Sequence, residues 1–155
     1  MRIGIPREIK PLEGRVGLVP DACGQLVKSG HRVYLETTAG EASGYPDELY
    51  AALGVEILPD AESLYHQAEL IVKVKEPVGA ELEMLRREHL LFSYLHLAAN
   101  PELMTRLLEI GLTALAFETV QEGTNLLLLA PMSDIAGRLA VQIGACLLHR
   151  PKGGK

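Results

Sequence analysis

Short apolar runs alternate with segments of helical periodicity along almost the whole chain. The apolar runs are bounded by glycine, proline or polar residues, which is typical of β-strands. The run at residues 69–74 is rich in β-branched side chains, so it is expected to be a buried central strand. The predicted strands are residues 2–5, 31–36, 55–58, 69–74, 89–95, 112–117 and 125–130.

Helical spacing of apolar residues predicts a helix in most of the intervals between these strands. Gly30 is expected to end the first helix, and Pro46 is expected at the first position of the second. Asn100 and Gly111 are expected to cap the two ends of the fifth helix, and Ser133 to be the N-cap of the last. The predicted helices are residues 21–29, 46–53, 61–67, 78–87, 101–110 and 134–149.

Repeated alternation of strand and helix favours an α/β fold with a mostly parallel sheet and helices on both faces. The chain has 155 residues, the size of one ordinary domain. With 48% hydrophobic and 23% charged residues, disorder is excluded.

Charge and targeting signals narrow the class of protein further. The net charge of −5 argues against nucleic acid and against an anionic membrane surface as partners. The sequence has neither a signal peptide nor an apolar run that would span a membrane, so a cytoplasmic location is expected. Cys23 and Cys146 lie in apolar helical patterns and are expected to be buried and reduced.

Ligands of open parallel sheets bind beyond the carboxyl ends of the strands, which directs attention to polar residues there. Arg15, in the segment after the first strand, could bind a substrate carboxylate through two parallel hydrogen bonds. The alternative is a surface arginine paired with Glu13 or Glu8.

Lys73 lies near the end of the apolar run at residues 69–74, and Lys75 comes directly after it. Lys75 could hold a carboxylate, and Glu76 could pair with Lys73. The alternative for Lys75 is an edge lysine that reaches solvent.

His96 is the only histidine expected at the carboxyl end of a strand, since His89 reads as a surface or cap residue. It could donate or accept a proton at a carbonyl or an amine. The alternative is a core histidine bonded to the backbone. Ser133, at the start of the last helix, either caps that helix or faces a ligand.

Several motifs are missing from the sequence. It has no Gly-x-Gly-x-x-Gly turn after a strand and no phosphate-binding P-loop. No spacing of histidine and cysteine suits zinc, so no metal site is predicted. The chain is therefore not expected to supply a dinucleotide-binding fold of its own.

Taken together, seven segments in this order resemble the N-terminal part of the alanine dehydrogenase family, which includes the alpha subunit of nicotinamide nucleotide transhydrogenase. The segments are residues 2–8 (RIGIPRE), 14–16 (GRV), 73–77 (KVKEP), 94–98 (YLHLA), 117–120 (FETV), 129–133 (LAPMS) and 135–138 (IAGR). The resemblance implies a Rossmann-like or flavodoxin-like catalytic domain that lacks the dinucleotide-binding domain.

The resemblance also implies roles for individual residues. Arg15 and Lys75 match residues that hold the carboxylate of pyruvate or L-alanine, and His96 matches the histidine at the reacting carbon. Met132 and Ser133 match the segment that lines the nicotinamide pocket. The implied cofactor is NAD, and the implied assembly is a homo-oligomer, a hexamer in full-length relatives.

Family members are well over twice as long as this chain. The resemblance therefore implies a substrate domain at residues 1–133, followed at 134–155 by a connecting helix and the start of a linker to an absent NAD-binding domain. The implied function is the N-terminal part of an NAD-dependent alanine dehydrogenase that is inactive alone. The alternatives are a non-enzymatic remnant or interaction module, and a piece of a transhydrogenase alpha subunit, against which the His96 motif argues.

Overall fold

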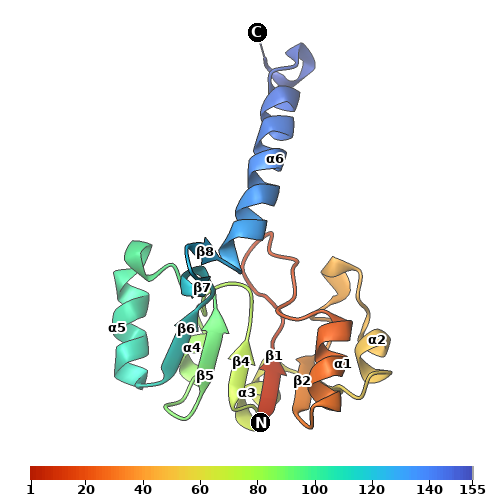
Figure 1. The fold of residues 1–155 in the computed structure, drawn as a ribbon, viewed down its shortest axis with the longest axis vertical. Helices are drawn as coiled ribbons and strands as arrows, with labels where there is room; N and C mark the ends of the chain where they lie inside the picture. The colour runs from red at the N-terminus through yellow and green to blue at the C-terminus, as the bar shows by residue number, and fades with distance from the viewer. Residues whose placement is uncertain (155) are drawn as a thin grey trace. The chain divides into compact units, whose positions relative to one another are not determined.

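The computed structural model describes residues 1–154 of the chain, and these divide into two compact units, residues 1–116 and 117–154. The first unit is built on six parallel strands in the order β3-β2-β1-β4-β5-β6 (Figure 1). This order confirms the predicted α/β class with a parallel sheet. The strands are β1 (Arg2–Ile5), β2 (Arg32–Glu36), β3 (Glu56–Leu58), β4 (Leu70–Val72), β5 (Leu90–Ser93) and β6 (Thr113–Ala116).

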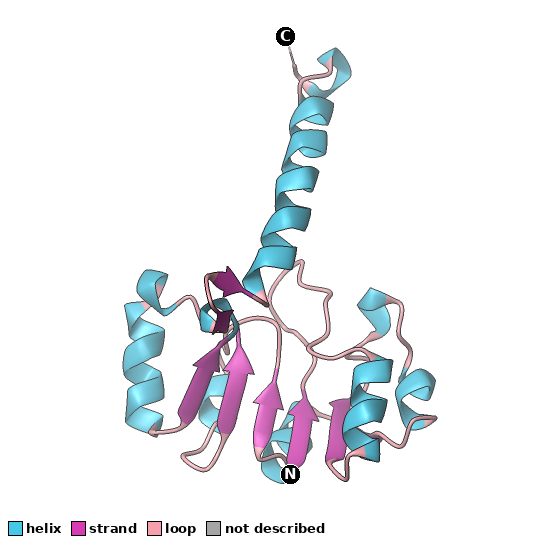
Figure 2. Ribbon diagram, in the orientation of Figure 1, coloured by secondary structure: helices cyan, strands magenta, loops and turns pink. Residues whose placement is uncertain are grey.

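Helices connect successive strands of this sheet (Figure 2). Pro46 is the N-cap of the second helix rather than its first residue, and the helix predicted at 78–87 is a single turn. Asn100 and Gly111 cap the fifth helix as predicted, and the Asn100 side chain accepts a hydrogen bond from the amide of Leu103. The helices are α1 (Pro20–Lys28), α2 (Asp47–Ala51), α3 (Ala61–Gln67), α4 (Glu81–Met84) and α5 (Pro101–Ile110), with 3-10 turns η1 (Glu41–Ser43) and η2 (Leu97–Ala99).

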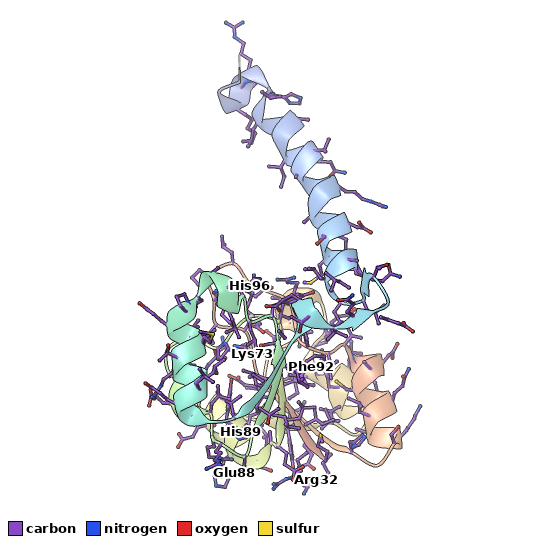
Figure 3. The ribbon with its side chains drawn as sticks, turned by 60° about the vertical axis from the view of Figure 1, so that its left-hand side comes forward. Arg32, Lys73, Glu88, His89, Phe92 and His96 are labelled. Atoms are coloured by element: carbon purple, nitrogen blue, oxygen red, sulfur yellow. The ribbon has the colours of Figure 1, made fainter. Side chains whose placement is uncertain are left out.

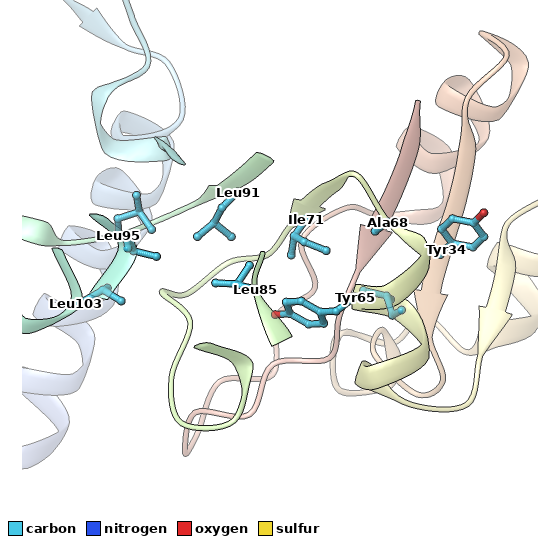
Figure 4. Packing of buried hydrophobic residues seen from close by; sticks show 10 residues of the cluster. Tyr34, Tyr65, Ala68, Ile71, Leu85, Leu91, Leu95 and Leu103 are labelled. Carbon is cyan, nitrogen blue, oxygen red and sulfur yellow. The ribbon is translucent and has the colours of Figure 1, made fainter. Parts of the chain in front are cut away.

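The sheet has a buried cluster on each face, which explains the strong apolar patterns of its strands. Alternate residues of β2 point to opposite faces, with Tyr34 in one cluster and Val33 and Leu35 in the other. The larger cluster joins the sheet to α3, α4 and α5 (Figure 4), and the smaller joins it to α1 and α2. The prediction of helices on both faces is therefore confirmed.

The second unit contains η3 (Phe117–Thr119), the antiparallel pair β7 (Gln121–Glu122) and β8 (Asn125–Leu126), helix α6 (Leu129–Leu147) and η4 (Arg150–Lys152). The strand predicted at 125–130 is thus two residues long. The last helix begins at Leu129, so Ser133 lies inside α6 and is not its N-cap. Pro131 is compatible with the first turn, because amides there have no partner within the helix.

Cys23 is buried as predicted, whereas Cys146 on α6 is exposed. Burial raises the pKa of the Cys23 thiol to about 12, so this group stays a protonated thiol. The prediction for Cys146 was wrong because an apolar pattern gives burial only where another surface covers it, and α6 has no buried residue. No helix within residues 1–154 combines the length and the apolar character that crossing a membrane requires.

His89, which was expected to be a surface or cap residue, is buried just before β5. The amide of Arg86 donates to its Nδ1 at 3.0 Å, and its Nε2 lies 3.0 Å from the carbonyl oxygen of Tyr65. These partners select the neutral ring with its proton on Nε2. Burial and the positive charge of Arg86 lower the pKa of His89 below its ordinary value of 6.5.

The free energy of unfolding is therefore expected to decrease as the pH falls below about 6.5, the ordinary pKa of histidine. In that range the unfolded chain takes up a proton that the folded His89 resists, so acid favours unfolding. Urea titrations of the 155-residue chain between pH 8 and pH 5 measure this decrease. It should be smaller in His89→Gln but unchanged in His66→Gln, since His66 is exposed. Equal decreases in the two variants would contradict the assignment to His89.

Candidate functional site

The candidate site lies where the strand order reverses, between the neighbouring strands β1 and β4. The segments that follow these two strands leave the same edge of the sheet, which is where open α/β sheets bind ligands. Gly17, in the segment after β1, passes so close to β4 that a Cβ atom there would lie 2.6 Å from the carbonyl oxygen of Val72. The segment after β1 is thereby held against the end of β4.

Arg15 is positioned by a neighbouring carboxylate in the same loop. Its Nε donates to Glu13 Oε1 at 2.8 Å, and its terminal nitrogen to Glu13 Oε2 at 2.5 Å. The Glu13 side chain is 9% exposed, whereas that of Arg15 is 47% exposed. The pairing with Glu13 weighed as an alternative is therefore present, and half of the guanidinium side chain still faces solvent.

Lys75 acts on the same carboxylate as Arg15. The hydrogen bonds from Arg15 are the main reason that the pKa of Glu13 lies below its usual value, and the positive charge of Lys75 adds to this effect. Lys75 is half-buried, so it is not a lysine that simply extends into water. Two cations in the segments after β1 and β4 thus act on one carboxylate.

Glu8 fixes the backbone that carries Lys75. Its Oε1 accepts hydrogen bonds from the amides of Val74 at 2.6 Å and Lys75 at 3.2 Å. Burial raises the pKa of Glu8, although the Lys73 ammonium and these amides act in the opposite direction. Residues after β1 therefore hold the turn after β4 in place.

Lys73 is fully buried between two carboxylates. Its Nζ lies 3.7 Å from Glu8 Oε2 and forms a close ion pair with Glu81, which also accepts a hydrogen bond from the Tyr65 hydroxyl. The predicted pairing of Lys73 with Glu76 was therefore wrong. Since β4 ends at Val72, the alternation of a strand does not determine where side chains 73–76 point.

Glu76 pairs with Lys10 and with His96 instead. Lys10 Nζ lies 2.5 Å from Glu76 Oε1, and His96 Nδ1 lies 3.5 Å from Glu76 Oε2. Burial would raise the pKa of Glu76, but the Lys10 ammonium and other favourable contacts hold it below its usual value. A charged carboxylate thus stands beside the imidazole.

His96 lies beyond the carboxyl end of β5, at the opposite end of this strand from His89 (Figure 3). Its backbone is left-handed, with φ 51°, which is uncommon for a residue other than glycine. The ring stacks on Tyr94, with 5.9 Å between centroids, and its side chain is 48% exposed. A half-exposed imidazole in a constrained backbone can exchange protons with a bound ligand.

Three of the five residues singled out in the sequence lie in segments that follow strand ends, Arg15 after β1, Lys75 after β4 and His96 after β5. The charge of Lys75 acts on Glu13, the partner of Arg15, and Tyr94, on which His96 stacks, acts electrostatically on Arg15. Met132 and Ser133 belong to the second compact unit, on α6. Their roles at a nicotinamide pocket stay predictions.

The sequence analysis singled out basic residues and a histidine, but it did not identify the carboxylates that hold them in place. The charged loop after the first strand was the available signal, but its spacing did not indicate which carboxylate meets which cation. A small cavity of about 180 Å³ opens beside this loop. Its lining residues are Arg7, Glu8, Glu13, Gly14, Arg15, Thr38, Ala39 and Ala42. Residues 1–154 contain no group of three or more His, Cys, Asp or Glu side chains that could hold a metal ion.

Comparisons with known proteins agree with the resemblance inferred from the sequence. The family model described as "Alanine dehydrogenase/PNT, N-terminal domain" matches residues 4–136. Alanine dehydrogenase of Bacillus subtilis (strain 168) is 52% identical over 155 residues, which are all of this chain and 41% of that protein. Alanine dehydrogenase of Methanococcus maripaludis is 47% identical over 156 residues, covering 100% of this chain and 42% of that protein.

Solved structures give the same result. One titled L-alanine dehydrogenase superposes with a TM-score of 0.94 at 49% identity, covering 100% of this chain and 43% of the other. A transhydrogenase from Sinorhizobium meliloti superposes with a TM-score of 0.74 at 27% identity, covering 79% of this chain and 36% of the other. The chain spans about two fifths of the length of the curated relatives described above.

Proposed function

This chain belongs to the family of alanine dehydrogenase/PNT N-terminal domains, and on that premise we propose that it is the substrate-binding part of an NAD-dependent alanine dehydrogenase. The proposed reaction converts L-alanine, NAD and water to pyruvate, ammonia and NADH. The observation that carries the proposal is the placement of Arg15 and Lys75 in the segments after the neighbouring strands β1 and β4, where Arg15 pairs with Glu13 and the charge of Lys75 acts on the same carboxylate. Both substrate and product are small carboxylates, for which such a pair of cations is suited.

In this proposal Arg15 and Lys75 bind the carboxylate of L-alanine or pyruvate and so fix the position of its second carbon. Arg15 has a planar, permanently charged group that can form two parallel hydrogen bonds, and Lys75 adds a compact positive charge. Fixing a small substrate at its carboxylate leaves the reacting carbon in one orientation, which lowers the entropic part of the barrier.

His96 handles protons at the reacting carbon. When pyruvate is bound, a protonated imidazole donates to the carbonyl oxygen, and in the reverse direction the neutral ring accepts a proton. Its neighbours Tyr94 and Glu76 limit the rotation of the ring. His96 is thus proposed as the catalytic residue of this part of the enzyme.

The described residues do not form a cradle for NAD. The segment between β1 and α1 runs from residue 6 to residue 19, in place of the tight glycine turn that holds a pyrophosphate at a helix N-terminus. We therefore assign the main NAD contacts to parts of such an enzyme outside this chain. Met132 and Ser133 are proposed to contribute one wall of the nicotinamide pocket.

The metabolic role, location and assembly that we propose are those that the family resemblance implies. We propose a role in the breakdown of L-alanine in the cytoplasm, within a homo-oligomer. A non-enzymatic module and a transhydrogenase piece receive less support. The cations after β1 and β4 and the left-handed backbone of His96 give a reason for enzymatic use, and the similarity to the transhydrogenase is lower in identity, coverage and TM-score.

A chimera tests the proposal, in which this chain replaces the matching 155 residues of the Bacillus subtilis relative. We expect it to oxidise L-alanine with NAD. Arg15→Met and Lys75→Met should each raise the KM for pyruvate about 10- to 100-fold, because each removes a hydrogen bond to a charged group. Initial rates of NADH consumption with pyruvate and ammonium measure this change.

The matched control is Arg32→Met, which removes an exposed arginine paired with Glu56. It should leave the KM unchanged. A folded chimera that binds NADH but does not oxidise L-alanine would contradict the proposed function. Variants of Arg15 and Lys75 with the KM of the unsubstituted chimera would contradict the assignment of these residues.

A further inference from the structure

One oxygen of the Glu76 carboxylate is a buried hydrogen-bond acceptor without a donor in the described residues. Its Oε2 atom is shielded from solvent and accepts no hydrogen bond within the part of the chain that the structure describes. A buried acceptor without a donor costs free energy, so such an atom calls for an explanation. The group that explains it is His96, whose Nδ1 lies 3.5 Å away.

The other oxygen of Glu76 is firmly held. Lys10 Nζ lies 2.5 Å from Oε1, and the Glu76 side chain is 11% exposed. Lys10 comes from the loop after β1, whereas Glu76 follows β4, so the ion pair joins both segments that form the site. With Oε1 fixed by Lys10, Oε2 is presented to the imidazole from a constant position.

The plane of the imidazole and the position of its proton are set by different contacts. The left-handed backbone and the stacking on Tyr94 orient the ring. In a neutral imidazole, the partner of one nitrogen decides which nitrogen carries the proton. A carboxylate at Nδ1 places the proton there, which makes Nε2 the acceptor of the neutral ring.

We infer that Glu76, held by Lys10, is the positioning residue that fixes the tautomer and orientation of His96, so that Nε2 is the atom that exchanges a proton with the substrate. This inference rests on the proposed function of His96 and adds a residue to it. We expect the distance of 3.5 Å between Nδ1 and Oε2 to shorten when substrate binds, as is common for hydrogen bonds in active sites.

The tautomer of His96 is measured on the 155-residue chain by ¹H–¹⁵N correlation spectra of the imidazole, assigned with His96→Gln. We expect the neutral ring of the unsubstituted chain to carry its proton mainly on Nδ1. In Glu76→Met, which keeps the side-chain length but removes the acceptor, the proton should move mainly to Nε2. Glu76→Gln and Lys10→Met should give intermediate ratios.

The same substitutions in the chimera separate positioning from folding. Glu76→Met should lower kcat about 10- to 100-fold, the usual value of a residue that orients a functional histidine, and change the KM for pyruvate little. The control is Glu69→Gln, which removes a carboxylate paired with Arg2 at the other end of β4. It should change neither the tautomer nor kcat. Unaltered amide spectra outside the site verify that each variant is folded.

The two proposals fail separately. If Glu76→Met leaves both the His96 tautomer and kcat unchanged while His96→Ala abolishes turnover, Glu76 has no positioning role and the proposed function stands. If the tautomer responds to Glu76→Met but the folded chimera does not oxidise L-alanine, the positioning role stands and the proposed function is wrong.

Discussion

Replacing His96 with alanine in the chimera is expected to lower kcat for L-alanine oxidation about 10²- to 10⁴-fold, the range that general acid–base catalysis contributes. The loss should fall on kcat because the imidazole acts at the reacting carbon, whereas Arg15 and Lys75 hold the carboxylate. Steady-state rates give kcat and KM, and fluorescence titration gives the Kd for NADH. The Kd should remain within a few-fold of that of the unsubstituted chimera.

His66→Ala is the matched control, since it removes an exposed histidine from α3, which lies before β4 in the chain and contains no candidate site residue. Its kcat should equal that of the unsubstituted chimera. A kcat for His96→Ala within a few-fold of the control would refute the catalytic role of His96. A large rise in the Kd for NADH would show instead that His96 serves cofactor binding.

Replacing Lys73 with methionine is expected to lower the free energy of unfolding of the 155-residue chain by about 3–5 kcal/mol, the usual cost of removing one partner from a buried ion pair. Glu8 and Glu81 would then remain as two buried carboxylates without their cation. Because single domains have about 5–15 kcal/mol of stability in total, the loss is a large fraction. Urea unfolding followed by circular dichroism measures it.

Arg106→Met is the control for Lys73→Met, because Arg106 forms only exposed pairs, with Glu83 and Glu109, and should cost less than about 1 kcal/mol. If Lys73→Met does not fold, the double variant Lys73→Met, Glu81→Gln should fold, since it removes one of the uncompensated charges. A Lys73 variant as stable as Arg106→Met would contradict a structural role of this ion pair, and so would a double variant that also fails to fold.

Local signals were sufficient for the elements whose ends are set by neighbouring residues. Asn100, Pro101 and Gly111 specify both ends of α5, and the structure has these ends where the sequence predicted them. Helix α4 was predicted too long because the chain turns extended at Leu85, and the amide of Arg86 bonds to His89. Such a tertiary contact is not visible in helical periodicity.

The place of the candidate residues in the fold was predictable, but their ion-pair partners were not. The sequence put Arg15, Lys75 and His96 after strands of a parallel sheet, and such a sheet has the carboxyl ends of its strands at one edge. The pairing of Lys10 with Glu76 joins residues 66 positions apart. Which carboxylate meets which cation depends on the packing of two loops, and no short-range pattern in the sequence encodes that packing.

The close approach of Gly17 to β4 also determines where this protein can tolerate change. A side chain at position 17 would collide with the backbone of Val72. A natural or engineered substitution there therefore requires the backbone of the loop or the end of β4 to shift. Leu12, at the tip of the same loop, is fully exposed to solvent. Sequence drift, tags and insertions are therefore tolerated best near the tip at Leu12, whereas the stretch around Gly17 is the part of the loop that a library should leave intact.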